Sequence, residues 1–270
     1  MKMKKWAVLI AAGALVASLA LFGCSSGGGS GSGSKDGGNA TDAGYALIND
    51  GKLTVAASLD FPPFENLNGN KPEGFAVDLM GLLAEEMGLE ANYLPSTKFD
   101  TIVPLIQTGG KADIGVSSFT VTDERLAQID FTDTYCDVNQ SITVLKDSGI
   151  TDVKQLEGKK VGAQTGTTGY EWAAENIKDV EVVGFDEMTA VFAALQSGQI
   201  DAVAVDLPVA NYYVKSAYTD CQVIKEIPTG EQYAVVVSKE NPELTKALNT
   251  ALKAVKENGK YAELEAKWLQ

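Results

Sequence analysis

Strand-like runs alternate with helix-like runs along most of the chain, and this alternation restricts the available folds more than any other feature. We expect strands at residues 53–58, 112–116, 141–145, 160–163, 180–185, 201–205, 222–227 and 233–238. We expect helices at residues 75–87, 99–109, 169–177, 187–198 and 208–216, and two more within 242–269 that break near Asn258–Gly259. Strands that alternate with helices favour mainly parallel sheets built from βαβ units. The sequence therefore predicts an α/β fold.

Two segments repeat one plan, namely IVPLIQTGGKADIGVSS (102–118) and VFAALQSGQIDAVAVD (191–206). Each contains an apolar helix, a glycine at the end of that helix, and a strand that starts at an aspartate and ends in polar residues. Exposure alone explains one polar strand end. Two matched ends, at Ser117–Ser118 and at Asp206, favour a binding site, because ligands of α/β sheets bind beyond the carboxyl ends of strands. A body of about 225 residues could form one domain, but the repeat predicts two sheets whose edges face each other.

The N-terminus has the layout of an export signal. Lysines at positions 2, 4 and 5 precede an apolar run over residues 7–22, and Gly23–Cys24 follows it. The four residues from Leu21 to Cys24 resemble a bacterial lipobox, in which the cysteine becomes the lipidated first residue. We therefore expect a signal peptide at 1–23, lipidation of Cys24, and a Gly/Ser-rich tether at 24–44. An uncleaved anchor helix and an artificial linker are the alternatives for these segments.

Composition excludes several classes of function. The chain carries a net charge of −14, and loss of the three signal lysines would make it −17, so the body repels nucleic acid and anionic lipid. The chain has no histidine, which leaves no transition-metal site of the usual kind and no base for a serine or cysteine nucleophile. Cys136 and Cys221 lie in an exported body, where they could form a disulfide or remain two buried thiols.

Charged and aromatic residues near the two strand ends suit a zwitterionic ligand. Arg125 is the only arginine of the chain, and a guanidinium holds a carboxylate through two parallel hydrogen bonds. Thr122 ahead of it predicts a helix start. Asp206 offers an acceptor for an ammonium group, and the loop QTGTTG (164–169) precedes a helix whose N-terminus can bind an anion. Phe61 and Phe99, each more typical of a core when taken alone, could form an aromatic shelf. This set fits an α-amino acid.

The body from about residue 53 to 268 resembles the bacterial extracellular solute-binding proteins of family 3, which are the amino-acid-binding subunits of polar amino acid ABC transporters. The segments that carry the resemblance are FPPFE (61–65), GFAVDL (74–79), residues 99–132, LEGKKVGAQTGTTG (156–169) and LQSGQIDAVAVD (195–206). The resemblance implies a two-lobed, periplasmic-binding-protein-like type II fold. It places lobe 1 at 45–134 and 233–270, lobe 2 at 138–229, and hinge crossings near 134–138 and 229–233.

The resemblance also implies roles for single residues. Arg125 would pair with the ligand α-carboxylate, and Asp206 would take the α-ammonium group. The other residues expected at the ligand are Ser118, Thr120 and Thr168 for the carboxylate, Ser117 and Thr120 for the ammonium group, and Phe61 and Phe99 as a sandwich. Gly74, Phe75 and Asp78 also match, and we interpret them as a turn, a core contact and a helix start.

Specificity depends on residues around the ligand side chain. Family members that bind cationic amino acids or glutamine often place an acidic residue where Ser58 stands, which argues here against arginine, lysine or histidine. Asp60 and Glu65 are near in sequence and could substitute for it. Gln164 is expected to face the ligand side chain, and we favour a neutral polar amino acid.

The resemblance implies a lipid-anchored receptor on the extracellular face of the cytoplasmic membrane. It would be a monomer without cofactor or metal, would not be an enzyme, and would deliver its ligand to an ABC permease. Two alternatives stay open. One is an enzyme of the same fold, such as a dehydratase of a small carboxylic acid, and the other is the ligand-sensing lobe of a signalling system.

Overall fold

The computed structural model describes residues 39–40 and 44–270, which belong to one compact unit. The predicted signal peptide, Cys24 and nearly all of the tether lie outside the described residues. Among the described residues, none of the helices combines the length and the apolar character that a membrane crossing needs.

A nine-stranded mixed sheet organises the described residues, in the order β12-β11-β13-β10-β14-β8-β3-β7, with β9 paired to β14. Its strands are β3 (Lys52–Ala56), β7 (Glu90–Tyr93), β8 (Ile114–Thr120), β9 (Asp130–Phe131), β10 (Cys136–Leu145), β11 (Lys160–Gln164), β12 (Glu181–Phe185), β13 (Ala202–Asp206) and β14 (Cys221–Val237). Strands β12, β11 and β13 are parallel, as are β8, β3 and β7. The long strands β10 and β14 are antiparallel to each other and join these two blocks. The α/β prediction is confirmed, but the two predicted sheets form one hydrogen-bonded sheet.

Strand β14 is continuous where the sequence predicted two strands, at 222–227 and 233–238. The predicted break contains Pro228 and Gly230, which usually end a strand. In the structure a bulge absorbs these residues, because Gln140 pairs with Ile227 while Val138 already pairs with Glu231. The amino-terminal part of β14 therefore pairs with β10, and its carboxyl-terminal part from Tyr233 pairs with β8.

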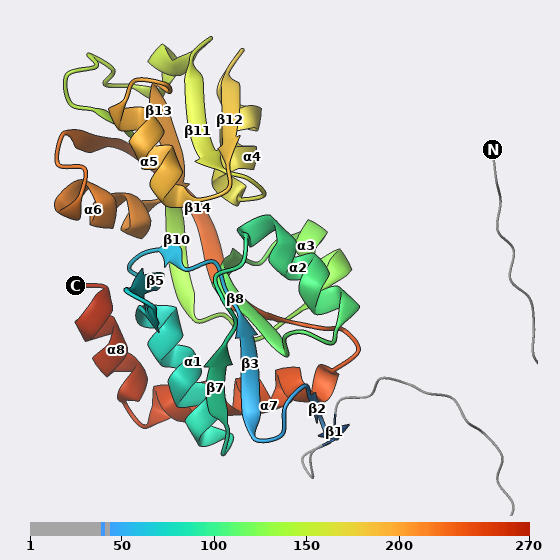
Figure 1. Cartoon of the computed structure of the whole chain (residues 1–270). Coiled ribbons are helices and arrows are strands. Elements are labelled where there is room, and N and C mark those ends of the chain that lie inside the picture. The colour runs from blue at the N-terminus through green and yellow to red at the C-terminus, as the bar shows by residue number, and fades with distance from the viewer. Residues whose placement is uncertain (1–38, 41–43) are drawn as a thin grey trace, which may run out of the picture. The chain divides into compact units, whose positions relative to one another are not determined.

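Eight helices cover the sheet in the described part of the chain. They are α1 (Phe75–Glu86), α2 (Phe99–Thr108), α3 (Asp123–Gln128), α4 (Thr168–Asn176), α5 (Met188–Gln196), α6 (Leu207–Ser216), α7 (Pro242–Glu257) and α8 (Lys260–Trp268), with one 3₁₀ turn at Val153–Leu156. Helices α4, α5 and α6 lie with strands β11 to β13, and the other helices lie with β3, β7 and β8 (Figure 1). All the predicted helices are present, and the break between α7 and α8 falls at Gly259, whose φ is 86°. Of helix α3 the sequence predicted only the start, at Thr122. The strands that were not predicted include β1 (Asn39–Ala40), β2 (Ala46–Leu47), β5 (Glu65–Asn68), β6 (Lys71–Glu73), β7 and β9.

The two repeated segments form α2 followed by β8 and α5 followed by β13. Both strands are buried at every position, because helices cover them and the neighbouring strands pair with them. Gly109 caps α2 with a φ of 67°, and Gly198 follows α5 with a φ of 72°, so the predicted glycine turns are confirmed. The strands end at Thr120 and Asp206, on the two sides of the β10–β14 pair.

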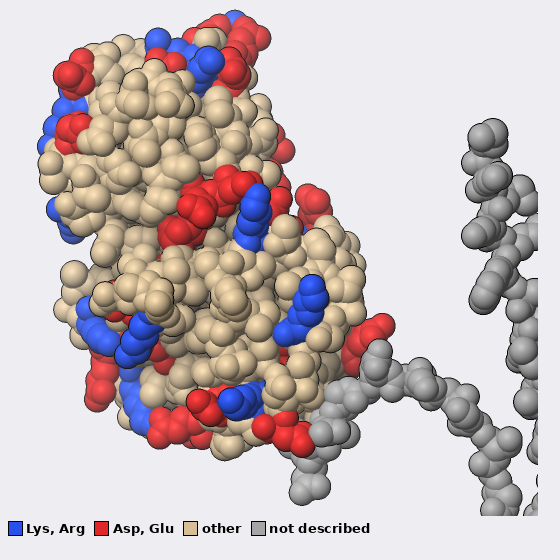
Figure 2. Space-filling model, in the orientation of Figure 1, with Lys and Arg blue, Asp and Glu red and all other residues tan. Residues whose placement is uncertain are grey.

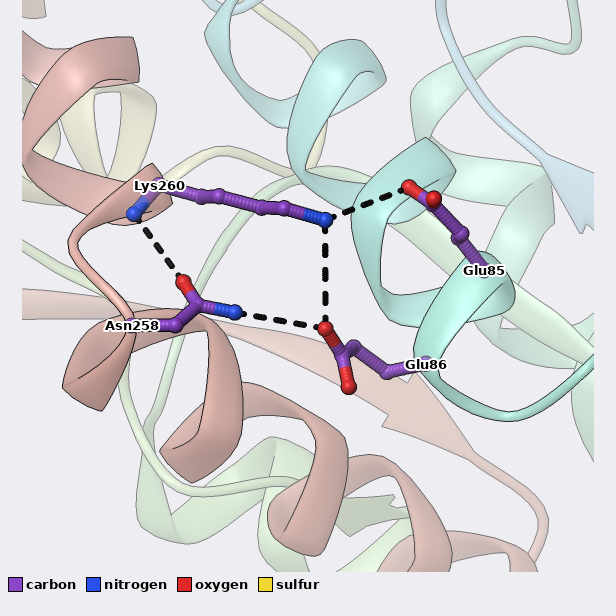
Figure 3. A network of polar contacts seen from close by, with 4 residues as sticks. All are labelled: Glu85, Glu86, Asn258 and Lys260. Carbon is purple, nitrogen blue, oxygen red and sulfur yellow. Dashed lines mark hydrogen bonds and ion pairs between the residues drawn. The ribbon is translucent and has the colours of Figure 1, made fainter.

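Charged side chains hold the carboxyl-terminal helix against α1. Lys260 at the start of α8 lies 3.5 Å from Glu85 and 3.9 Å from Glu86, and Asn258 donates to Glu86 (Figure 3). At the other end of α8, Lys267 and Trp268 both donate to Asp78 of α1. The contacts of Lys260 and Asn258 with Glu85 and Glu86 are exposed, so they contribute little to the stability of the fold. The face drawn in Figure 2 shows acidic and basic side chains at its margins, and a further acidic group near its middle with a basic side chain beside it.

Cys136 and Cys221 do not form a disulfide with each other. Both are free thiols. Cys136 is at the first residue of β10, whereas Cys221 pairs with Leu145 at its last residue. The two cysteines are therefore separated by the length of β10, about 30 Å, while a disulfide requires Cα atoms within about 7 Å of each other.

Candidate functional site

One pocket collects nearly all of the residues that the sequence placed at a ligand. The pocket is lined by Phe61, Phe99, Ser117, Ser118, Thr120, Arg125, Gln164, Thr167, Thr168 and Asp206. They come from β4 (Asp60–Phe61), α2, the end of β8, α3, the end of β11, the start of α4 and the end of β13. Both repeated strand ends thus meet at this place. The cavity measures about 10 Å³, which is room for a single water molecule.

Arg125 is held in place by its own helix and by the chain on both sides of the pocket. Thr122 caps α3 by accepting from the backbone N–H of Arg125, as predicted. Nη1 of the guanidinium donates to the carbonyl oxygen of Thr120 at 2.8 Å, and Nη2 donates to that of Gly166 at 2.9 Å. A guanidinium has five N–H donors, so donors remain for a ligand carboxylate.

Aromatic rings and distant carboxylates define the surroundings of the guanidinium. Its central carbon lies 5.5 Å from the centre of the Phe99 ring and 5.6 Å from that of Phe119, and the two rings stack on each other. Burial lowers the pKa of Arg125 from its ordinary value, while the negative charges of Glu171 and Asp206 oppose this effect. A positive charge in this partly buried position attracts an anion more strongly than it would in water.

Asp206 is buried at the end of β13, with 6% of its surface exposed. Burial and the nearby charge of Glu231 raise its pKa to about 7, and the Tyr233 hydroxyl and the charge of Arg125 act in the opposite direction. Oδ1 accepts from Nε2 of Gln140 at 3.0 Å. A buried carboxylate with a raised pKa and one strong partner is suited to receive a cation.

A layer of polar residues beneath the pocket was not found from the sequence. Gln140 on β10 is buried, and its Nε2 lies within hydrogen-bonding distance of Asp206, of Thr168 Oγ1 (3.1 Å) and of Glu231 Oε2 (3.2 Å). Glu231 on β14 also accepts from the hydroxyls of Thr168 at 2.7 Å and Thr120 at 2.8 Å. Both residues sit within long strands, and only the three-dimensional pairing of β10 with β14 brings them under the site.

Ser117 and Ser118 line the pocket, but Ser118 is largely engaged elsewhere. Its backbone N–H donates to Glu65 Oε1 at 2.9 Å, and its hydroxyl bonds to Oε2 at 2.8 Å. Its φ of 50° is unusual for a residue with a side chain. Burial raises the pKa of Glu65 to about 8, so this carboxyl group is largely protonated at neutral pH. The backbone N–H and the hydroxyl of Ser118 are thus both in contact with Glu65.

Ser58 does not line the pocket, in contrast to the prediction. Its backbone N–H donates to Ser117 Oγ at 3.3 Å, and its hydroxyl donates to Asp60 Oδ1 at 2.7 Å. The second oxygen of Asp60 accepts from the backbone N–H of Met188 at 2.6 Å. Asp60 and Glu65 are thus both occupied by protein partners, and neither lies among the residues that line the pocket.

The loop after β11 supplies the remaining wall. Thr167, which the sequence analysis did not single out, caps α4 by accepting from the N–H of Tyr170 at 3.3 Å and donates to the carbonyl of Gln164 at 2.7 Å. The first N–H groups of a helix have no intrahelical partner. Those of Thr168 and Gly169 therefore remain for an anion at the start of α4, as the Gly/Thr loop predicted. In residues 39–40 and 44–270 there is no cluster of three His, Cys, Asp or Glu side chains that could hold a metal ion.

Comparisons with known proteins identify the family of the chain. The model of the family described as bacterial extracellular solute-binding proteins, family 3, matches residues 53–270. A probable histidine-binding protein of Neisseria gonorrhoeae is 32% identical, with 99% of this chain and 96% of the relative covered. The arginine-binding extracellular protein ArtP of Bacillus subtilis is also 32% identical, with 98% of each covered.

Solved structures give the same result. The structure of an ancestral arginine-binding protein bound to arginine superposes with a TM-score of 0.76 at 36% sequence identity, with 82% of this chain and 99% of that chain covered. The fold is therefore the two-lobed periplasmic-binding-protein fold that the resemblance implied. The chain belongs to the bacterial extracellular solute-binding proteins of family 3.

Proposed function

We propose that the protein is the extracellular substrate-binding subunit of an amino acid ABC importer and binds an L-amino acid in the pocket described above. The observation that carries the proposal is the placement of one guanidinium and one buried carboxylate, Arg125 and Asp206, around a single pocket. An α-amino acid has the two opposite charges that this pair would satisfy. The relatives described above, which are named for histidine and arginine, support the same class of ligand.

The α-carboxylate and the α-ammonium group of the ligand contact different walls of the pocket. The α-carboxylate lies against the free N–H groups of Arg125 and the N-terminus of α4, where the helix dipole also favours a negative charge. The α-ammonium group lies against Asp206. Phe61 and Phe99 enclose the ligand from two sides, as the resemblance implied.

Gln164 suggests which side chains the pocket accepts. Its Nε2 donates to the carbonyl oxygen of Asp186 at 3.0 Å, and a carbonyl oxygen can only accept. The amide oxygen of Gln164 is therefore the atom that can face the ligand, and it requires an N–H or O–H donor. Glutamine, arginine and histidine supply such a donor, whereas aliphatic amino acids do not.

Binding requires the walls of the pocket to separate, because a cavity of about 10 Å³ cannot admit an amino acid. We place the lobes at 45–134 with 233–270 and at 138–229, and the hinge crossings near 134–138 and 229–233. The change of partner of β14 from β10 to β8 at Tyr233 supports this division. The ligand stabilises the closed form because only that form satisfies both of its charges.

The proposal includes the location and partners of the protein. An export signal and lipidation at Cys24 would anchor a monomeric receptor at the extracellular face of the cytoplasmic membrane, where it would deliver its ligand to a permease. The protein itself would not be an enzyme. Turnover of prephenate or arogenate by the purified protein would instead favour the dehydratase alternative.

A thermal-shift screen against the common L-amino acids tests the proposal. Ligand raises the apparent stability by RT ln(1 + [L]/Kd), so the preferred amino acid should give the largest shift. Calorimetry with that ligand should then show at least about tenfold weaker binding for Arg125→Lys, because an ammonium group cannot form the two parallel hydrogen bonds. Lys71→Ala, a change at an exposed residue of β6, is the control. No shift with any amino acid, using protein freed of ligand by unfolding and refolding, would contradict the proposal.

A further inference from the structure

One oxygen of Glu231 connects the two sides of the pocket. Oε2 accepts from Thr120 Oγ1 at 2.8 Å and from Thr168 Oγ1 at 2.7 Å, and Gln140 Nε2 lies 3.2 Å from it. Thr120 ends β8 and Thr168 starts α4, so the two hydroxyls approach Glu231 from opposite sides. Glu231 is half-buried on β14 and is not among the residues that line the pocket.

Donor and acceptor counts fix the direction of these bonds. An ionised carboxylate can only accept, and a hydroxyl has a single proton. Thr120 and Thr168 must therefore each give that proton to Glu231. The oxygen of Thr168 also accepts from Gln140 Nε2 at 3.1 Å, which is consistent with its proton pointing away from that amide. Both threonine oxygens are then left with lone pairs only, so they can accept from a ligand cation but cannot donate to a ligand carboxylate.

The same counts of donors and acceptors determine the orientation of the Gln140 side-chain amide. Its Nε2 faces Asp206 Oδ1, Thr168 Oγ1 and Glu231 Oε2, all of which can accept. Its amide oxygen is buried without a hydrogen-bond partner in the described residues, and lies where a side chain on Gly169 would approach within 2.9 Å. The opposite orientation would place this oxygen against two carboxylates. One oxygen of Asp206 is thus held, which leaves the other for the ligand.

We propose that Glu231 is a positioning residue that turns the hydroxyls of Thr120 and Thr168 into acceptors for the α-ammonium group of the ligand. The inference rests on the proposed function and adds to it. Asp206 and the two threonine oxygens form the ammonium site, and Arg125 with the N-terminus of α4 forms the carboxylate site. This changes the role expected for the Thr168 hydroxyl, which the resemblance had assigned to the carboxylate.

Ligands that lack one charge separate this role from a merely structural one. L-arginine has both groups, agmatine lacks the carboxylate, and 5-guanidinopentanoic acid lacks the ammonium group. Where the wild-type protein prefers L-glutamine, the matching set is L-glutamine, 4-aminobutanamide and glutaramic acid. Dissociation constants of all three ligands are measured by calorimetry, or by competition with the full amino acid, for wild type, Glu231→Ala, Glu231→Gln and Glu226→Ala. Glu226 is the control, because it lies on the same strand but contacts Asn139 at the surface.

We expect Glu231→Ala to weaken binding of the amino acid and of the amine by about tenfold or more, because a hydrogen-bonded set around a cation is lost. Binding of the acid without an ammonium group should not weaken. Glu231→Gln keeps an acceptor oxygen and should recover part of the loss, and Glu226→Ala should match wild type. An equal loss for all three ligands would show that Glu231 only joins the two sides of the pocket, and no loss for any of them would also overturn the inference.

A second measurement gives an independent answer. The charged or hydroxyl groups that face Asp206 are Glu231, Arg125 and Tyr233, and the charge of Glu231 makes ionisation of Asp206 harder. In Glu231→Gln, the pH at which binding of the amino acid weakens should therefore move to a lower value. An unchanged pH profile would contradict the inference. A wild-type protein that binds no amino acid at all would instead contradict the proposed function.

Discussion

Asp206 is a buried carboxyl group whose surroundings favour the binding of a positive charge. Without a ligand, its carboxyl group is buried near Glu231, and both effects raise its pKa to about 7. An ammonium group placed against it would reverse the balance, because an opposite charge nearby favours the ionised form. Affinity for the ligand is therefore linked to the protonation of this one residue.

The first prediction concerns the pH dependence of binding. Below pH 7 the carboxyl group of Asp206 must lose a proton before it can bind the ammonium group. The dissociation constant should therefore rise by about tenfold for each unit by which the pH falls below 7. Above pH 8 the dissociation constant should level off. Calorimetry between pH 5 and pH 9 measures this profile. Asp206→Asn should bind weakly throughout and show no such slope, and a flat profile for wild type would contradict the assignment.

The second prediction concerns the stability of the ligand-free protein. The pKa of Asp206 is raised from 3.8 to about 7 on folding, so the folded state binds more protons than the unfolded state between these values. The contribution of Asp206 to the stability of the folded state is therefore lost as the pH rises from 3.8 to about 7. Asp206→Asn should raise the free energy of unfolding at pH 8 and give no gain near pH 4, as measured by urea unfolding. A loss of stability at pH 8 would show that the ionised group is well paired without ligand.

Single residues differed in how far the sequence could place them. Arg125 and Asp206 were found because one is the only arginine and the other ends a buried strand. Glu231 and Gln140 were missed because both lie outside the strands that the sequence predicted, Gln140 just before the strand at 141–145 and Glu231 in the break between 222–227 and 233–238. Ser58 was expected at the ligand by position alone, but Asp60 two residues later provides a nearer partner for its hydroxyl.

At the scale of elements, the start of α1 depends on a close contact with the preceding loop. Gly74 has a φ of 135°, and a Cβ atom there would lie 2.2 Å from the carbonyl oxygen of Phe64. The neighbouring N–H groups of Phe75 and Ala76 donate to the carbonyls of Pro63 and Phe64. The contact thus joins α1 to the loop that follows Phe61.

The third prediction uses this contact. Gly74→Ala should lower the free energy of unfolding by about 2 kcal/mol or more, because the backbone must move to relieve the overlap. Gly81→Ala is the control within the same helix. It has no atom within 4 Å of the added Cβ atom, and should stabilise the protein by about 0.5–1 kcal/mol. Urea unfolding of both variants measures the difference, and equal effects would contradict the proposed close packing.

Elements with a strong apolar period were predictable, and the others were not. Helices α1, α2 and α5 each bury an apolar face, and all three were found. The hairpin of β5 and β6 was missed because its residues are mostly polar and only its backbone pairing defines it. Helix α3 has six residues and buries none of them fully, so no apolar period could reveal it, and only the capping residue Thr122 indicated its start.

At the scale of the whole described body, several contacts join the parts that we assign to the two lobes. Asp60 accepts from the N–H of Met188 at the start of α5, and Tyr213 of α6 donates to the carbonyl oxygen of Asp60 at 3.0 Å. Lys98 forms an ion pair with Asp186. A carboxylate at a helix N-terminus is favoured by the helix dipole, so Asp60 should stabilise the closed arrangement.

The fourth prediction follows from the position of Asp60, which contacts α5 without lining the pocket. Asp60→Ala should weaken ligand binding by about three- to tenfold, the usual cost of losing a helix cap. X-ray scattering should also show a larger radius of gyration for the ligand-free variant than for wild type. Asp147→Ala, at an exposed turn, is the control. Unchanged scattering and unchanged affinity would contradict a role for Asp60 in closure.

The arrangement of the sheet marks the limit of sequence reasoning at this scale. The repeated segments correctly indicated two similar halves, each with a polar strand end at the pocket. They could not show that the halves share one sheet, because that depends on pairing between β10 and β14, whose paired residues lie 76 to 97 positions apart along the chain. Local patterns carry no information on such long-range pairing.

Because the chain has no histidine, the number of protons released on ligand binding can be assigned to individual side chains. Most proteins exchange protons near neutral pH through several histidines, which obscures the contribution of a binding site. Here the side chains with a pKa raised into that range are Asp206, at about 7, and Glu65 beneath Ser118, at about 8. Calorimetry in buffers of different ionisation enthalpy would therefore measure how many protons the pocket releases when a ligand binds. Near pH 6, each ligand that binds should release close to one proton.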